Sequence, residues 1–335
     1  MKTIIYLLFI YILGLVSCSG KEDIKEVENR QTQDSVLVEK KETITIKADD
    51  IIIEKDLLYD QYTLADSYPY KDTVRMFQWD KMREGLAILE NIRQKSAKWA
   101  ILQNYKNKNG EAPLVKIYRR NEYKRIADTL GIERYQSVPL FLAEDTLTAE
   151  RYGRDGTLVK LLEDSTKKFL KVSAANFDGE WYVPKKYIKE IHDTIMFNKA
   201  IFVDRNNENI ATLERSDSKW LVRSMNPATT GLHKPPHQQE TPLGMFVIQE
   251  KKSKMVFLKD GSTETGGFAP YASRFTNGGY IHGIPVNEPR KNLIEYSPSL
   301  GTTPRSHMCV RNATSHAKFI YDWALTESTI VFVIE

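Results

Sequence analysis

The sequence predicts a mainly β protein with some α-helix: an N-terminal helical segment, a small β-barrel and a larger mixed-β domain. Residues 71–135 include apolar side chains at helical spacing, whereas residues 136–192 consist of short β-rich runs between tight turns. Residues 193–335 hold many β-branched runs separated by Gly, Pro and Asn, which is typical of a sheet-based domain. At 335 residues the chain is long enough for two modest domains, or for one large domain and a tether.

The composition argues against a nucleic-acid-binding protein. Apolar residues make up 41% and charged residues 27% of the chain, which is ordinary for a soluble globular protein. The net charge of +4 is small, and the basic residues form no dense patch interleaved with aromatic residues. We therefore expect no nucleic-acid partner, and the sequence leaves the oligomeric state open.

Residues 1–17 have the features of a signal peptide. Lys2 supplies a positive start, and residues 4–16 form an apolar run that is too short to span a bilayer comfortably. The run ends in Leu15-Val16-Ser17-Cys18, which resembles a bacterial lipobox; an ordinary signal peptide with a chance Cys is the alternative. The resemblance implies lipidation of Cys18 and a firm membrane anchor, because several acyl chains hold far better than one. It implies a cell-envelope protein, expected on the outer membrane and facing the periplasm.

Residues 18–70 are expected to form the lipid anchor and a flexible tether, since residues 19–50 are charged, polar and poor in aromatics. In the helical segment, a second short helix is predicted over residues 123–130, ended by Gly131. The first helix is predicted within residues 72–104 by apolar side chains three and four residues apart: Met82, Leu86, Leu89 and Ile92.

The small β domain is predicted over residues 136–192. Asp155-Gly156 and Asp178-Gly179 are tight-turn dipeptides between strand-like runs. The order of turns and strands, ending in residues 181–184 (WYVP), resembles a bacterial SH3-like barrel. The resemblance implies a domain that docks on peptidoglycan or braces a catalytic domain; the alternative is that Trp181 and Tyr182 are plain barrel core.

Residues 193–335 contain the motifs that indicate a chemical function. The sequence Thr230-Gly231 is followed by residues 241–246 (TPLGMF), then by residues 280–283 (YIHG), then by residues 306–312 (SHMCVRN). Each piece alone is weak, but the ordered set resembles the L,D-transpeptidase catalytic domain of the YkuD type, over about residues 201–333. A helix over residues 314–325 and a last strand over residues 329–334 are predicted to close this domain.

The resemblance implies a role for each matching residue. Cys309 matches the nucleophile, His282 the general base, and the carbonyl of Gly283 the group that orients the imidazole ring. Ser306 and His307 match the neighbouring motif residues. Arg311 matches a residue that helps to hold the site and the substrate. The implied substrate is a peptidoglycan stem peptide, cut between diaminopimelate and D-Ala and joined to an amine in a 3→3 crosslink, and the implied mechanism needs no cofactor and no metal.

Elementary chemistry fits these roles. A thiol is a better nucleophile near neutral pH when its pKa is lowered, and an imidazole is its natural proton acceptor. We expect Asn312 or Thr314 to cap the following helix, so that its positive end lies near the thiol. The backbone N–H groups of Met308 and Cys309 are candidate oxyanion donors.

Two departures from the family pattern stand out. Met308 occupies a position that is usually Gly, which costs roughly 1 kcal/mol or more if the backbone there is left-handed. Residues 283–305 exceed the usual spacing, and we expect them to form a loop beside the cleft. Tyr271 is a candidate for lining the substrate groove, with core packing as the alternative.

Other interpretations stay open at this stage. If Cys18 carries lipid, Cys309 has no partner for a disulfide; it is then either a used thiol or a small buried hydrophobe. His233 and His237 flank a Pro pair that forbids a helix, so we expect no metal site there. A carboxypeptidase or wall hydrolase could use the same Cys and His, and a non-catalytic wall-binding lipoprotein with a decayed site is the third alternative.

Overall fold

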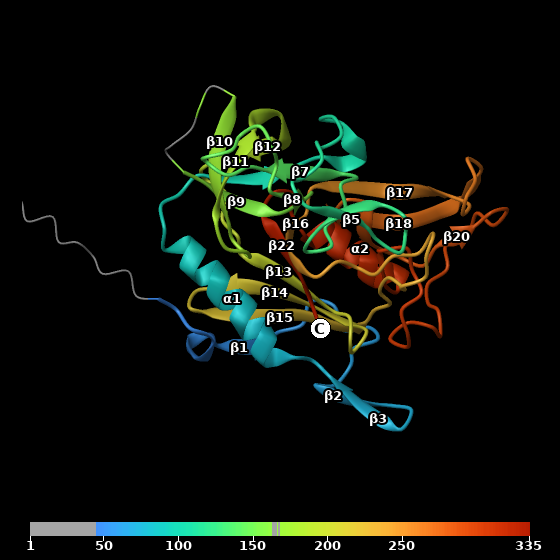
Figure 1. The fold of residues 1–335 in the computed structure, drawn as a ribbon. Coiled ribbons are helices and arrows are strands. Elements are labelled where there is room, and N and C mark those ends of the chain that lie inside the picture. The colour runs from blue at the N-terminus through green and yellow to red at the C-terminus, as the bar shows by residue number, and fades with distance from the viewer. Residues whose placement is uncertain (1–44, 163–165, 167) are drawn as a thin grey trace, which may run out of the picture. The chain divides into compact units, whose positions relative to one another are not determined.

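Strands make up most of the regular structure, as predicted, in a computed structural model that describes residues 45–162, 166 and 168–335. Within these residues there are two α-helices, α1 (Trp79–Arg93) and α2 (Thr314–Trp323), and three sheets of five or six strands (Figure 1). The predicted signal peptide, Cys18 and the first part of the predicted tether lie outside the described residues. In the described part of the chain, no helix is long and apolar enough to cross a bilayer.

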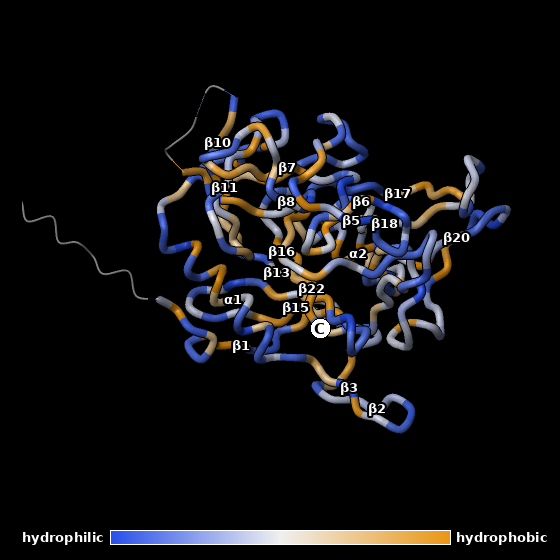
Figure 2. The backbone as a smooth tube through the Cα atoms, in the orientation of Figure 1, coloured by the Kyte–Doolittle hydropathy of each residue, from blue (hydrophilic) through white to orange (hydrophobic). Residues whose placement is uncertain are grey.

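The largest sheet has six strands in the order β1-β15-β14-β13-β22-β16. Its strands are β1 (Ile53–Lys55), β13 (Lys199–Asp204), β14 (Asn209–Ser216), β15 (Lys219–Pro227), β16 (Gly244–Val247) and β22 (Thr329–Ile334). Both faces are covered, which explains the almost continuous apolar runs of β13 and β22. Figure 2 shows these hydrophobic stretches gathered around β13, β15, β16 and β22.

Helix α1 packs on one face of this sheet, through buried Met82, Leu86 and Leu89 against Phe202 and Phe332. The predicted helical stripe is therefore correct. The helix is shorter than predicted because residues 67–76 form a hairpin, and residues 99–102 form a strand. The hairpin strands are β2 (Ser67–Tyr70) and β3 (Thr73–Met76).

The second predicted helix, over residues 123–130, is wrong. Residues 118–128 form a hairpin instead, with strands β5 (Tyr118–Arg120) and β6 (Ile126–Asp128). Lys124 has a left-handed backbone (φ 59°) in the connecting turn, where Arg125 donates to the Asn121 side chain at 3.0 Å. This turn chemistry competes with a helix and prevails.

The tether is also shorter than predicted, because the chain packs against the large sheet before residue 70. Ile51 is buried, and β1 pairs in parallel with β15. The apolar side chains of this otherwise polar segment thus pack at the edge of the large sheet.

The small β domain is an open five-stranded sheet in the order β11-β10-β9-β4-β12, so the prediction of a closed barrel is wrong for the described residues. Strand β4 comes from the segment predicted as helical, which moves the start of this domain toward the N-terminus. The strands are β4 (Trp99–Leu102), β9 (Leu158–Leu161), β10 (Phe169–Ala174), β11 (Glu180–Pro184) and β12 (Ile188–Glu190). A two-stranded ladder of β7 (Ser137–Leu140) and β8 (Arg151–Arg154) lies beside it.

The third sheet lies on the other face of the large sheet, together with α2. Its order is β17-β18-β19-β21, and β20 adds to β18. The strands are β17 (Glu250–Leu258), β18 (Thr265–Thr276), β19 (Gly279–His282), β20 (Val286–Asn287) and β21 (Val310–Arg311). The observed α2 and β22 agree with the helix and last strand predicted for the end of the chain.

Candidate active site

Two short neighbouring strands bring the predicted cysteine and histidine to one place. Strands β19 and β21 are parallel, with Ile281 opposite Val310 and His282 opposite Arg311. A backbone bond from Asn312 N–H to the His282 carbonyl (2.9 Å) continues the pairing. Cys309 directly precedes β21, and both Cys309 and His282 line one cleft of about 920 Å³.

Cys309 is a buried thiol at the floor of this cleft. Its Sγ donates to the carbonyl of Gly278 at 3.4 Å, and its side chain packs against Tyr280 and Ala272. Burial raises the pKa of Cys309 to about 11, although a hydrogen bond from the backbone of Tyr280 and the charge of Arg311 act in the opposite direction. The expectation of a lowered thiol pKa is therefore wrong for the free protein, because desolvation outweighs both of these effects.

His282 is buried and held by its neighbour. Its Nδ1 lies 2.6 Å from the Gly283 carbonyl, and a carbonyl only accepts, so Nδ1 carries the proton. Nε2 is then the basic atom of the ring. Burial lowers the pKa of His282 to about 4, and Arg311 lowers it further, while the bond to Gly283 opposes the shift.

Gly283 can only be glycine in this arrangement. A Cβ there would lie 2.8 Å from Oγ1 of Thr314 and 2.9 Å from Cγ of Pro270. Because the chains approach closely here, the N–H of Gly283 donates a hydrogen bond to the Pro270 carbonyl at 2.9 Å. The carbonyl of Gly283 is thereby kept beside the imidazole of His282. The glycine that follows His282 thus has a steric reason.

The Thr-Gly and Thr-Pro pieces of the motif hold the cysteine loop. Ser306 N–H donates to the Thr230 carbonyl at 3.0 Å, and Ser306 Oγ donates to the Cys309 carbonyl. Thr241 Oγ1 accepts from Gly231 N–H at 2.9 Å and donates to the Met308 carbonyl at 3.0 Å. The three separate motif pieces therefore form one hydrogen-bonded frame around the loop.

Glu208 anchors this frame and was not anticipated. Its carboxylate accepts from the Thr230 backbone N–H at 2.8 Å and from the Thr230 hydroxyl. Burial raises the pKa of Glu208 to about 7. Glu208 lies in a polar hairpin turn, and nothing in that local sequence marks it as buried.

Met308 has a left-handed backbone with φ 74°, a conformation that glycine adopts without a steric penalty. Its N–H donates to the Gln239 carbonyl at 2.8 Å, so this group is already bonded. The expectation that the Met308 N–H is an oxyanion donor is therefore wrong for this arrangement. The backbone strain, by contrast, agrees with the reasoning from sequence.

We expect Met308→Gly to raise the free energy of unfolding by about 0.5–1 kcal/mol. Removing Cβ relieves the cost of the left-handed backbone, about 1–2 kcal/mol, which stabilises the folded protein. Glycine also gives the unfolded chain more conformational freedom, which destabilises the folded protein by about 0.5–1 kcal/mol. Urea unfolding measures the change. Met76→Gly, in the regular strand β3, is the matched control and should destabilise; a Met308→Gly protein that also loses stability would contradict the strain argument.

The other two candidates, His307 and Arg311, both line the cleft. His307 is half-exposed at the cleft rim, with Nε2 2.9 Å from Oδ1 of Asp260. Arg311 lines the cleft, and its buried Nε has no hydrogen-bond partner among the described residues. Its charge acts on both Cys309 and His282.

Two predicted roles are wrong. Asn312 does not cap α2: the N-cap residue is Ala313, and the Asn312 side chain bonds to His316 Nδ1 at 3.0 Å instead. Thr314 is the first residue of α2, and its hydroxyl donates to the Ile294 carbonyl at 2.6 Å. Tyr271 is absent from the residues that line the cleft; its ring packs against Tyr321 of α2, with 5.9 Å between centroids.

The long segment after His282 contributes to the cleft, as expected, through Pro285 and Asn287. Tyr105 and Lys106 also line it, although they lie far upstream of the motif residues. Their contribution depends on tertiary packing and has no local sequence signal. In the described residues, no group of three His, Cys, Asp or Glu side chains is arranged to hold a metal ion.

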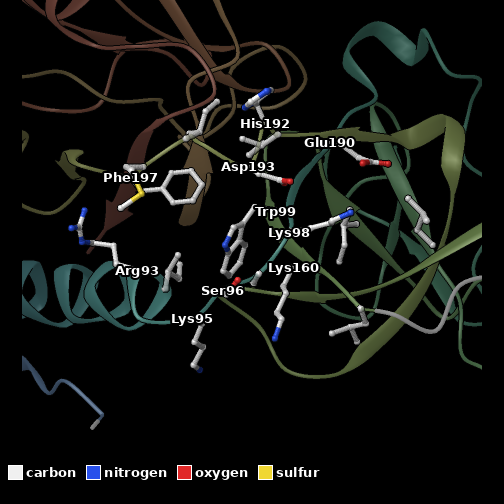
Figure 3. Close-up of a pocket in the computed structure, with 18 residues that line it drawn as sticks. Arg93, Lys95, Ser96, Lys98, Trp99, Lys160, Glu190, His192, Asp193 and Phe197 are labelled. Carbon is white, nitrogen blue, oxygen red and sulfur yellow. The ribbon is translucent and has the colours of Figure 1, made fainter. Parts of the chain in front are cut away.

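A second hollow has a volume of about 1070 Å³ (Figure 3). Trp99 and Phe197 meet edge to face inside it, with 6.3 Å between ring centroids. Lys95, Lys98 and Lys160 surround them. Neither Cys309 nor His282 lines it.

Comparison with known proteins relates the cleft to a family. Residues 198–333 match the family model described as the L,D-transpeptidase catalytic domain. This range contains Cys309, His282 and every motif piece, but not Tyr105 or Lys106. A search of curated proteins finds no match.

Solved structures that resemble the chain include three from different bacteria. An L,D-transpeptidase from Mycobacterium smegmatis is 17% identical over 53% of this chain and 82% of its own, with a TM-score of 0.33. One from Mycobacterium tuberculosis is 15% identical over 55% and 92%, with a TM-score of 0.35. A fused Zn-dependent amidase/peptidase with a peptidoglycan-binding domain from Clostridium acetobutylicum is 20% identical over 41% and 51%, with a TM-score of 0.29. The chain thus covers about half of the last protein's length.

Proposed function

We propose that the protein is a peptidoglycan L,D-transpeptidase in which Cys309 is the nucleophile and His282 the general base. The observation that supports this most is the pairing of β19 with β21, which puts both side chains in one cleft. The Gly283 carbonyl fixes the ring so that Nε2 is the basic atom. The family match over residues 198–333 supplies the reaction class.

In the proposed reaction, Sγ of Cys309 attacks the carbonyl of the third stem residue, at the L-centre of diaminopimelate. The thiol proton passes to Nε2 of His282 as the S–C bond forms, and the imidazolium returns it to the leaving amine of D-Ala. A thioester remains on Cys309. A side-chain amine of a second stem then attacks the thioester, releases the thiol and forms a 3→3 crosslink.

Burial decides how the proton moves in this scheme. The raised pKa of Cys309 and the lowered pKa of His282 keep both groups neutral in the free protein near pH 7. In the proposed reaction, proton transfer to the imidazole therefore accompanies attack by the sulfur. Arg311 stabilises negative charge as it develops on the sulfur.

Product analysis tests the proposal. Purified disaccharide-tetrapeptides are incubated with the protein, the products are separated, and their masses are determined by mass spectrometry. New 3→3 dimers with release of D-Ala support a transpeptidase. Tripeptides without dimers would indicate a carboxypeptidase, cleaved stems a wall hydrolase, and unchanged substrate a non-catalytic wall-binding protein.

We expect the rate of Cys309 acylation by a carbapenem to stay level from about pH 7 to about pH 5. The pKa of His282 is lowered, so its basic form is lost only as the pH falls through about 4, whereas an exposed imidazole titrates near pH 6.5. The rate of mass gain after short incubations measures this. A half-maximal rate at about pH 6.5 would contradict a buried, neutral base.

We also propose that the protein is a lipoprotein anchored through Cys18, on the lipobox resemblance. Cys18→Ala should then move the protein from the membrane fraction to the soluble fraction, because the acyl chains provide the anchor. Fractionation followed by immunoblotting measures the change, and Ser19→Ala is the control. Continued membrane binding of the Cys18→Ala protein would refute the anchor.

A further inference from the structure

A loop between the Thr-Gly and Thr-Pro pieces of the motif is bonded to the backbone that carries the nucleophile. This loop, residues 232–240, is closed by two backbone hydrogen bonds of 3.0 Å between Lys234 and Gln238. The carbonyl of Gln239 accepts the 2.8 Å hydrogen bond from the N–H of Met308, the residue that directly precedes the nucleophilic cysteine. The position of the 232–240 loop therefore affects the position of the nucleophile.

The same loop is tied to the hairpin of β5 and β6 through His233. Its imidazole lies between two carboxylates, with Nε2 2.8 Å from Oε2 of Glu122 and Nδ1 2.8 Å from Oε1 of Glu240. Glu122 belongs to the turn between β5 and β6, whereas Glu240 is the last residue of the loop. The hydroxyl of Tyr123, in the same turn, donates to the Gln238 carbonyl at 2.9 Å. The hairpin and the loop thus meet at one cluster of polar side chains.

A second contact joins the hairpin side to the loop. Oε1 of Gln239 accepts from Nη1 of Arg125 at 3.0 Å, and Nε2 of Gln239 donates to Oε1 of Glu133 at 2.7 Å. Arg125 and Glu133 also pair with each other at 3.0 Å. Glu122, Arg125 and Glu133 all lie outside the range that matches the family model. The upstream part of the chain therefore supplies the groups that hold this loop.

The two bonds of His233 require a charged imidazole. A carboxylate only accepts hydrogen bonds, and a neutral imidazole has a single N–H, so it can donate to only one of the two carboxylates. The imidazolium donates to both. In agreement, the hydrogen bonds to Glu122 and Glu240 raise the pKa of His233 from its usual 6.5. Because the folded-state pKa is raised, both bonds are present below it, and one is lost as the pH rises through it.

The neighbouring groups keep their charge states while His233 titrates. Burial and the carboxylate of Glu240 raise the pKa of Tyr123 to about 12, so its hydroxyl stays neutral. The pKa of Glu240 is lowered in spite of its burial, through hydrogen bonds and the charges of His233 and Arg205. The guanidinium of Arg125, 5.8 Å from the centre of the Tyr123 ring, is always charged. The imidazole is therefore the group in this cluster that responds near neutral pH.

We propose that His233 is a positioning residue for the proposed reaction: its imidazolium clasps the 232–240 loop to the β5–β6 hairpin, and the loop holds Met308 in place beside Cys309. The proposal rests on the proposed function, because it acts through the backbone next to the nucleophile. His233 itself does not line the cleft around Cys309. Acylation is expected to be fastest with the clasp closed and to slow as His233 loses its proton.

Glu122→Gln tests the clasp, because glutamine keeps the size of the side chain and removes its charge. NMR titration of the full chain first gives the pKa of His233. The rate at which a carbapenem acylates Cys309 is then measured one pH unit below and one unit above that value. Below it, the Glu122→Gln protein should react about threefold more slowly than the unaltered protein, as expected for the loss of an exposed ion pair. Above it, the two rates should differ by less than about 1.5-fold, because the charge on His233 is already lost.

Two matched controls separate the clasp from a general effect of surface charge. Glu54→Gln removes an exposed glutamate of β1 that pairs with Lys219, and His192→Gln removes an exposed histidine that bonds to Thr194 two residues away. Neither substitution should change the acylation rate at either pH. His233→Gln, in contrast, should match the Glu122→Gln protein.

Hydrogen exchange reports on the clasp without any chemistry. In the peptide that contains Met308, exchange corrected for the intrinsic rate should be about threefold faster in the Glu122→Gln protein below the pKa of His233, and unchanged above it. The same rate ratio at both pH values, no effect in either measurement, or faster acylation of the variant would overturn the proposal. If the unaltered protein is not acylated at any pH, the proposed reaction fails, and hydrogen exchange alone decides whether the clasp exists.

Discussion

Cys309→Ala is expected to abolish acyl-enzyme formation completely, with no mass gain after incubation with a carbapenem and no crosslinked product. The thiol is the atom that forms the covalent bond in the proposed reaction, and no neighbouring group lining the cleft offers a comparable nucleophile. The fold should survive, because the change removes one small buried atom, a cost of about 1 kcal/mol. Intact-protein mass spectrometry and thermal unfolding measure the two effects.

Cys309→Ser is the matched control, since it keeps the size of the side chain and replaces the sulfur by a poorer nucleophile. It should bind carbapenem without a lasting adduct. The chain has one other cysteine, Cys18, so peptide mapping assigns any adduct that remains. An adduct that persists at another residue of the Cys309→Ala protein would refute the assignment of the nucleophile.

Asp155→Ala is expected to lower the free energy of unfolding by about 3 kcal/mol and to slow acylation strongly, although Asp155 does not line the cleft. Its buried carboxylate accepts five hydrogen bonds from both sides of the boundary between the upstream sheet and the catalytic sheets. The donors are Asn104 N–H, Tyr105 N–H, Arg274 Nη1, Gln249 Nε2 and Asn277 N–H, at 2.6–3.1 Å. Removing the carboxylate leaves the buried Arg274 guanidinium with only Glu250, at 3.4 Å, and such a loss typically costs several kcal/mol.

The effect on acylation follows from the same contacts. Asn277 precedes Gly278, whose carbonyl accepts the bond from Cys309, and Tyr105 lines the cleft. Urea unfolding and the acylation rate measure the two consequences. Asp178→Ala is the matched control, because Asp178 lies in the same Asp-Gly context but is exposed. Equal, small effects of both substitutions would contradict the central role of Asp155.

Asp155 and Asp178 also illustrate what local sequence cannot distinguish. Both precede Gly in strand-like surroundings and were expected in tight turns; Asp155 lies in a turn, whereas Asp178 lies in the bent connection between β10 and β11. At Gly156 a Cβ would lie 2.0 Å from the Phe275 carbonyl, so this turn is pressed against the catalytic sheet. The turn of Asp178 faces solvent. Which turn meets a second sheet depends on residues 120 positions away, such as Phe275, and no pattern within either turn reports it.

The sequence by itself determined the mainly β class, the centre of α1, helix α2, the last strand and the motif residues around Cys309 and His282. These follow from local periodicity and from a motif whose pieces keep their order along the chain. It also indicated the strain at Met308, because that depends on the backbone of one residue.

Only the tertiary structure decided the remaining features. It showed that residues 45–70 pack on a sheet, that the small sheet is open, and that Ala313 rather than Asn312 is the N-cap residue of α2. It also decided the electrostatics, because the pKa values of Cys309 and His282 depend on desolvation by side chains from several sheets. Burial and long-range contacts are properties of the whole packed chain. The sequence predicts them only where the spacing of apolar residues matches the period of a helix or a strand.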